Sequence, residues 1–183
     1  MLLLLVTILE TLFANLQEKV FQSDFVISIT EEASQPLNIP GSVTLQAEKF
    51  ALTMFGIEAT YDGENLYMYQ ADANELTISN PSKEELLTAN PFAFAEDLTA
   101  NANLTERDSK DGASTYVTLT PKDQSKGISR FVVKLRKADA MPLTVEMKEG
   151  NKTTLLTLKN SRFIDTPPTF TITKEAAFIN DLR

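Results

Sequence analysis

Apolar residues recur with helical spacing at the start of the chain. Those that share one helical face are Leu5, Leu9, Leu12, Phe13, Leu16 and Val20. This pattern predicts a helix from about Leu3 to Phe21. Residues 1–6 resemble the apolar core of a signal peptide but lack a basic start and a small-residue cleavage site. We interpret them as the first turns of the helix, in a chain whose targeting segment has been removed. A remnant of a signal peptide is the alternative.

Beyond this helix the apolar period changes to two, which is typical of half-buried strands. Predicted strands cover residues 25–30, 43–47, 50–54, 57–61, 66–69 and 74–79, and then 102–107, 116–120, 129–136, 143–148, 153–159 and 170–173. Turn signals separate many of them, including Gly56, Asp62-Gly63, Asn80-Pro81 and Asp111-Gly112. The order of strands and turns predicts a long antiparallel meander.

Two short helices are predicted to interrupt the strands after residue 81. Ser82 and Glu85 have the spacing of a capping box, and Asn90-Pro91 has the residues of an N-cap and a first helical position. Helices and sheet must bury their apolar faces against each other. We therefore predict one α+β domain over residues 1–183. Its antiparallel sheet is expected to be strongly curved, with the N-terminal helix and the short helices on the concave side.

Composition and charge restrict the possible functions. The chain has a net charge of −8 and a pI near 4.6, which argues against nucleic-acid binding and electrostatic attachment to anionic lipid. It has no histidine and no cysteine, so the usual general base, zinc ligands and nucleophile pairs are missing. Residues 108–112 lack the carboxylate spacing of a calcium loop and predict a hairpin turn. We expect no catalytic residue, metal or cofactor; an enzyme that uses carboxylates is the disfavoured alternative.

Several motifs occur in a recognisable order. Tyr61-Asp62-Gly63 precedes the 66–69 strand, Asn80-Pro81 precedes a helix, and the chain closes with Asp181-Leu182-Arg183. Thr120-Pro121-Lys122, Met141-Pro142-Leu143 and Phe170-Thr171-Ile172 lie between them in sequence. From about Leu9 to Arg183 this order resembles the LolA family, the periplasmic carriers of outer-membrane lipoproteins.

The resemblance implies that the curved sheet is an incomplete β-barrel capped by the helices. It also implies a non-catalytic, monomeric carrier in the periplasm of a Gram-negative bacterium. Its partners would be acylated lipoproteins, an inner-membrane ABC lipoprotein-releasing complex and an outer-membrane lipoprotein acceptor. A second hypothesis is a LolA-like sensory or structural domain that binds lipid or lipoprotein without transporting it.

The resemblance also suggests a hydrophobic cavity that holds acyl chains. Its candidate lining residues have period two, namely Phe25, Ile27, Val43, Leu45, Leu52, Met54, Leu66 and Met68. A filled core beneath the first helix requires the same pattern, so the sequence leaves both interpretations open. The candidate lid residues are Leu86, Leu87, Phe92 and Phe94; an ordinary capping insertion is the alternative for these helices.

One departure from the family concerns closure of this lid. Family members carry an arginine just before the third strand, and this arginine hydrogen-bonds to the lid. Residues 46–50 contain no arginine here. Lys49 is a possible substitute, but a lysine lacks the bidentate guanidinium fork.

Overall fold

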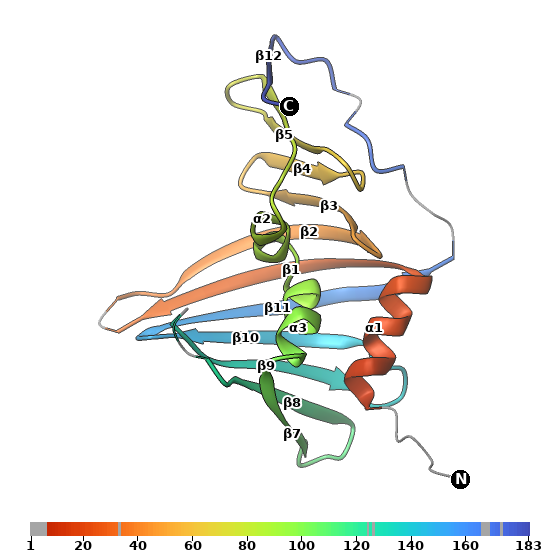
Figure 1. Cartoon of the computed structure of the whole chain (residues 1–183), viewed down its shortest axis with the longest axis vertical. Helices are drawn as coiled ribbons and strands as arrows, with labels where there is room; N and C mark the ends of the chain where they lie inside the picture. Colours follow the sequence, from red (N-terminus) through yellow and green to blue (C-terminus); the bar gives the residue numbers. More distant parts are fainter. Residues whose placement is uncertain (1–6, 33, 124, 126, 166–168, 173) are drawn as a thin grey trace.

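The computed structural model describes residues 7–32, 34–123, 125, 127–165, 169–172 and 174–183. In this part of the chain, one twelve-stranded sheet curves around three helices on one side (Figure 1). The helices are α1 (Ile8–Glu18), α2 (Lys83–Ala89) and α3 (Pro91–Thr99). The strands are β1 (Val20–Glu31), β2 (Leu37–Gln46), β3 (Lys49–Met54), β4 (Ile57–Tyr61), β5 (Leu66–Gln70), β6 (Glu75–Ser79), β7 (Ala102–Asp108), β8 (Ser114–Pro121), β9 (Ile128–Arg136), β10 (Pro142–Glu149), β11 (Lys152–Ile164) and β12 (Phe178–Asp181).

The sheet is open at both ends. Its order is β12-β6-β5-β4-β3-β2-β1-β11-β10-β9-β8-β7, so β12 and β7 form its two edges. Neighbouring strands are antiparallel except for β12 and β6, which run parallel. The predicted fold class, an α+β incomplete barrel with helices on one side, is confirmed.

Helix α1 is shorter than the sequence pattern predicts. Thr7 and Glu10 form a capping box at its start, and Leu9, Leu12 and Leu16 are buried. The helix ends at Glu18, and Lys19 is already extended, with φ −122° and ψ 160°. Val20 and Phe21 therefore belong to β1. The sequence pattern extends the helix too far because these two apolar residues of the strand happen to continue the helical spacing. The predicted start near Leu3 lies outside the described residues.

Strand β2 begins earlier than predicted, at Leu37, and it contains both Pro40 and Gly41. Its ladder with β3 starts at Gly41, so Pro40 lies where β2 pairs only with β1. A proline is tolerated where one side of a strand is unpaired, because its missing N–H is not needed there. Gly41 leaves room for the ring of Phe25: a Cβ at this position would lie 2.3 Å from Phe25 Cζ.

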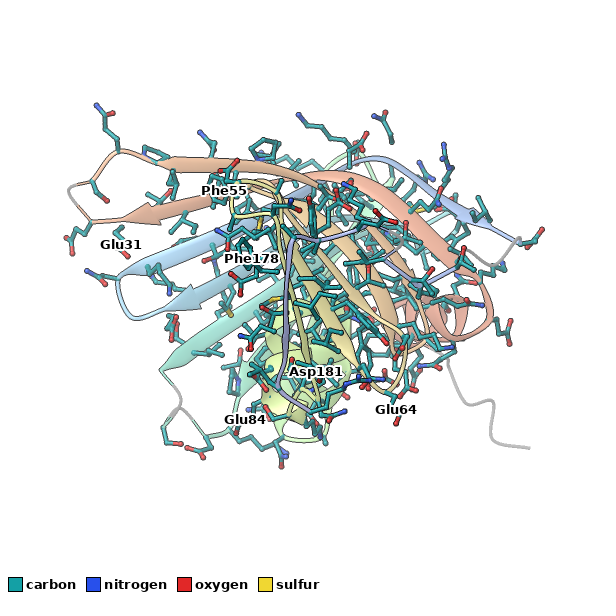
Figure 2. All side chains as sticks on the ribbon, turned by 90° about the horizontal axis from the view of Figure 1, so that it is seen from above. Glu31, Phe55, Glu64, Glu84, Phe178 and Asp181 are labelled. Atoms are coloured by element: carbon teal, nitrogen blue, oxygen red, sulfur yellow. The ribbon has the colours of Figure 1, made fainter. Side chains whose placement is uncertain are left out.

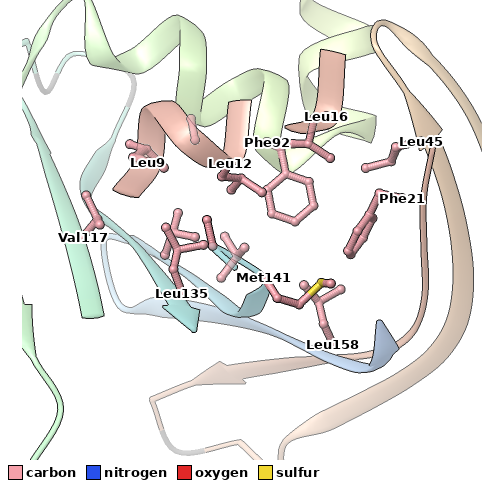
Figure 3. Packing of buried hydrophobic residues seen from close by; sticks show 14 of the residues in the cluster. Leu9, Leu12, Leu16, Phe21, Leu45, Phe92, Val117, Leu135, Met141 and Leu158 are labelled. Atoms are coloured by element: carbon pink, nitrogen blue, oxygen red, sulfur yellow. The ribbon is translucent and has the colours of Figure 1, made fainter. Parts of the chain in front are cut away.

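A filled hydrophobic core lies beneath α1 and α3 (Figure 3). Phe21, Phe131, Leu119 and Leu135 of the sheet are almost fully buried there. Phe92 of α3 meets the ring of Phe21 edge to face, with centroids 5.8 Å apart. The rings of Phe94 and Phe131 lie 5.3 Å apart. These contacts fix α3 against the sheet.

The C-terminal region differs from the prediction. Phe170 is buried, but Phe170–Ile172 form no strand, and Thr173 lies outside the described residues. The last strand is instead β12, which pairs with β6. A short alternating run can become a strand only where an unpaired edge is within reach, and sequence pattern does not show which segment takes that edge.

Candidate functional site

All eight candidate cavity residues lie on one face of the sheet. Cross-strand partners share a face, and the ladders pair Val43 with Leu52, and Ala59 with both Leu52 and Met68. Leu45 is linked to Leu66 in the same way through Phe50 and Tyr61. Residues two apart on one strand also share a face, which adds Phe25, Ile27 and Met54.

These residues differ in how deeply they are buried. Phe25 and Leu45 are buried members of the core, and Met68 is 42% exposed. The other five candidate residues are half-buried and pack against the core. We call them the open apolar face: Ile27, Val43, Leu52, Met54 and Leu66. The sheet is therefore filled beneath α1 and α3 and only partly covered at the open apolar face.

The open apolar face continues onto strands that the candidate list omits. Ile27 pairs with Leu156 of β11, which pairs with Val145 of β10, and Met147 follows two residues later. Leu156 and Met147 are half-buried and pack against the same core. The ends of β1, β2, β10 and β11 extend beyond the three helices (Figure 1). The sequence shows the period-two pattern of both strands, but it does not show that β11 pairs with β1 and β10 with β11.

The two short helices are attached to the sheet to different degrees. Phe92 and Ala95 of α3 are buried, whereas α2 has no buried residue. Leu86 and Leu87 of α2 are half-buried, and Leu86 packs against the core cluster that the open apolar face adjoins. The four candidate lid residues thus divide into two anchors on α3, Phe92 and Phe94, and two contacts on α2.

Asn90 is the junction between the two short helices. It ends α2, and its side chain accepts hydrogen bonds from the amides of Phe92 at 3.1 Å and Ala93 at 3.3 Å. Pro91 follows as the first residue of α3, as the sequence predicts. The side chain of Asn90 thus caps α3 while its backbone N–H closes α2, and the Lys83–Asp97 ion pair also joins the two helices.

Replacing Ser82 by alanine should loosen α2 alone. Ser82 and Glu85 form the predicted capping box, with Glu85 N–H donating to Ser82 Oγ at 3.3 Å and Ser82 N–H donating to Glu85 Oε2 at 2.7 Å. Loss of such a cap costs about 1 kcal/mol. We expect faster amide hydrogen exchange in α2 and unchanged exchange in α3. Thr88→Ala, which removes a hydroxyl elsewhere on α2, is the control; equal exchange in wild type and Ser82→Ala would contradict the expectation.

Two hollows lie beside α1. One of about 400 Å³ lies between α1, α3 and the β2–β3 turn, and its lining includes Leu45, Phe92, Lys49 and Glu96. Within the described chain, Lys49 makes no hydrogen bond or ion pair with α2 or α3. Lys49, the possible substitute for the arginine of the LolA resemblance, therefore makes no such contact with the candidate lid among these residues.

The second hollow, of about 640 Å³, is polar and lies between α1, β7–β8 and the β9–β10 turn. Its lining includes Asp108, Lys137 and Asp139. A hydrogen bond from Lys137, 2.5 Å from Asp108 Oδ2, lowers the pKa of Asp108. Arg136 donates to both carboxylate oxygens of Asp139 and lowers the pKa of that group. These carboxylates are held in structural ion pairs.

The Tyr61-Asp62-Gly63 motif serves as a structural turn. Gly63 has φ 104°, and Tyr61 donates to its carbonyl oxygen at 2.9 Å. Burial, followed by the charges of Glu48, Asp62 and Glu64, raises the pKa of Tyr61. Burial alone would raise the pKa of Asp62, but hydrogen bonds to its carboxylate, including those from the amides of Asn65 and Glu64, lower it. The motif builds the β4–β5 hairpin.

No described helix is long and apolar enough to cross a membrane. Within the same residues, no group of three or more histidines, cysteines, aspartates or glutamates is placed to hold a metal ion.

The fold and this site define a class of protein, with an open, curved sheet and a partly covered apolar face beside a filled core. No family model matches the chain, and no curated protein matches it. Its structure is similar to that of an uncharacterized conserved protein from Thermus thermophilus. The two are 14% identical, with a TM-score of 0.65 over 95% of this chain and 96% of that one.

Two further solved structures are similar. MucB is 15% identical with a TM-score of 0.50, over 92% of this chain and 62% of MucB. A LolA superfamily protein from Nitrosomonas europaea is 12% identical with a TM-score of 0.42, over 87% of this chain and 93% of that one. Identities this low show the fold alone. The architecture itself is an incomplete barrel, as the sequence resemblance implies.

Proposed function

We propose that the protein binds the acyl chains of lipoproteins on its open apolar face and carries them between membranes without catalysis. The observation that supports this most strongly is the one-sided ladder of half-buried apolar residues beside α2. A sheet that only completed a core would bury these side chains as fully as Phe131 and Leu119.

The energetics of an acyl chain explain why shape and apolarity suffice. Each buried methylene contributes about 0.8 kcal/mol, so a chain of sixteen carbons represents on the order of 10 kcal/mol. This is comparable to the folding stability of a domain. Release into water would be very slow, so cargo must pass by direct contact from carrier to acceptor. No general base or nucleophile is needed for such a transfer.

Helix α2 is the part of the candidate lid that we propose moves. Phe92 and Phe94 hold α3 on the core, whereas α2 has no buried residue and packs against the core through half-buried Leu86 and Ala89. A displacement of α2 about Asn90 would uncover the adjoining part of the open apolar face. Met54 and Met147 on that face are unbranched and adapt to irregular apolar ligands.

By the LolA resemblance, the cargo would come from an inner-membrane ABC lipoprotein-releasing complex and pass to an outer-membrane acceptor across the periplasm. One observation favours a second candidate function, a LolA-like domain that binds lipid or lipoprotein to sense it. The lid contact of the family arginine is missing, since Lys49 makes no bond to α2 or α3 in the described chain. A carrier that depended on that lock would not cycle in the same way.

A purified tri-acylated lipopeptide with a fluorescent label tests the proposal. We expect one lipopeptide to bind per chain, measured by fluorescence anisotropy and native mass spectrometry, and to pass on addition of a LolB-type acceptor. Binding without release would favour the sensory function. A lack of binding at micromolar lipopeptide would contradict both functions. The same peptide without acyl chains is the control and is expected not to bind.

A further inference from the structure

The last strand is attached to the sheet unlike any other strand in the described chain. β12 has four residues, runs parallel to β6, and all four of its residues are exposed. We call residues 174–183 the C-terminal arm. β12 is first and β11 eighth in the sheet order, so these two strands, consecutive in sequence, lie seven places apart in the sheet. Phe170 is buried partway along, so the arm is the piece beyond this anchor.

Within the described residues, the hydrogen bonds and ion pair of the arm to the rest of the chain all lie at one corner of the sheet. Ala177 and Phe178 donate backbone hydrogen bonds to the carbonyl of Asn74, at 3.1 and 3.2 Å, and Leu182 donates to Ile78 at 2.8 Å. These bonds hold the arm along β6.

Charged side chains add three contacts to the same corner. Lys174 forms an ion pair with Glu58 of β4, and its Nζ lies 5.2 Å from the ring centroid of Tyr69 on β5. Arg183 Nη1 lies 3.5 Å from Asn65 Oδ1 at the β4–β5 turn. The arm is therefore bound by β4, β5, β6 and their turns. These strands are several places in the sheet order from β11, the strand that precedes the arm in sequence.

The arm also leaves large apolar side chains in solvent. Phe178, Ile179 and Leu182 are 68%, 65% and 62% exposed. Figure 2 shows Phe178 and Asp181 on the strand at the outside of the sheet. Four exposed residues held mainly through backbone bonds form a weak terminal strand, and its departure would leave the N–H and C=O groups of β6 unpaired.

We propose that the C-terminal arm exchanges between two copies of this chain, so that the arm of each copy completes the sheet of the other. Exchange keeps every contact described above, including Lys174 with Glu58, because all of these partners lie in one corner of the receiving chain. A second copy is the occupant that the structure favours, since this segment already matches the backbone bonds and charges of β6 and its neighbours. Exchange of identical elements is a low-cost route to a dimer.

Engineered cysteines provide a direct test, because the natural chain has none. Thr77 of β6 and Asn180 of β12 are register partners. One preparation carries only Thr77→Cys and the other only Asn180→Cys. After the two are mixed at high protein concentration and oxidised mildly, we expect a disulfide between them, seen as a doubled mass on non-reducing gels. Its yield should rise with protein concentration. A chain with both substitutions should close its own disulfide when dilute.

Ser28→Cys and Asn38→Cys, register partners in the β1–β2 hairpin, form the matched control pair. Mixing these two single variants is expected to give no cross-link, since that hairpin cannot exchange without unfolding of the sheet. The proposal is overturned if the Thr77→Cys and Asn180→Cys mixture stays uncross-linked while the double variant closes within one chain. It is equally overturned if the control pair cross-links to the same extent. A dimer in light scattering without the specific cross-link would indicate edge-to-edge association and also contradict exchange.

Discussion

Replacing Leu52 by glutamate is expected to weaken binding of the acylated lipopeptide at least 100-fold and to leave the fold intact. Leu52 is half-buried on the open apolar face, between its cross-strand partners Val43 and Ala59. A carboxylate there must either lose water when an acyl chain covers it or keep that chain away. A penalty of about 3 kcal/mol or more corresponds to this loss of affinity. The measurement is a fluorescence anisotropy titration, with circular dichroism to monitor the fold.

The neighbouring residue offers a matched control. Thr53 is exposed and lies on the opposite face of β3, because successive side chains of a strand point to opposite sides. Thr53→Glu adds the same charge and is expected to bind the lipopeptide like the wild type. Unchanged binding by Leu52→Glu would show that the open apolar face does not hold the acyl chain. Equal loss in both variants would point instead to a general effect of the added charge.

Replacing Leu12 by alanine is expected to lower the free energy of unfolding by about 2–5 kcal/mol. Leu12 lies in the middle of α1, its exposed fraction is 0%, and it belongs to the core beneath the helix (Figure 3). Alanine would leave a cavity between helix and sheet that neighbours fill only partly. The loss is a large share of the roughly 5–15 kcal/mol by which domains are stable. Urea unfolding followed by circular dichroism measures it.

Gln17→Ala serves as the comparison for this variant. Gln17 is exposed on the same helix, and alanine is a good helix former, so we expect a change within about 0.5 kcal/mol. If Leu12→Ala were as stable as Gln17→Ala, α1 would not be packed on the sheet as the structure has it. The two variants together separate the contribution of core packing from that of helix propensity.

Features that depend on a few neighbouring residues could be predicted well. The capping box of Ser82 and Glu85, the cap at Asn90-Pro91 and the turns at Gly56 and Gly63 all occur where the sequence places them. Each is determined by hydrogen bonds or backbone angles within three or four residues. The alternation of residues 25–30 and 43–54 likewise indicated one apolar face, and the ladders place all of its members on the same side.

Features that depend on distant partners were less predictable. The apolar pattern predicts that α1 ends at Phe21, because Val20 and Phe21 continue the helical spacing. In the structure both residues belong to β1. Phe92 and Phe94 were grouped with the lid, but their partners in the core, Phe21 and Phe131, are far away in sequence. The strand expected at residues 170–173 gave way to β12, since only the folded sheet shows which edge is unpaired.

The sequence by itself determined the order of helix, meander and paired short helices, and it determined the one-sided apolar stripe. These features follow from periodicity and local caps, which depend on residues close together in the chain. The lack of histidine and cysteine chemistry follows from the composition alone. Only the tertiary structure decided which part of that stripe is filled and which stays half-exposed. The same alternation suits a core and a binding surface equally, and burial depends on which helix packs above each strand. Here α1 and α3 fill one part of the concave side, and α2 leaves the other part only partly covered.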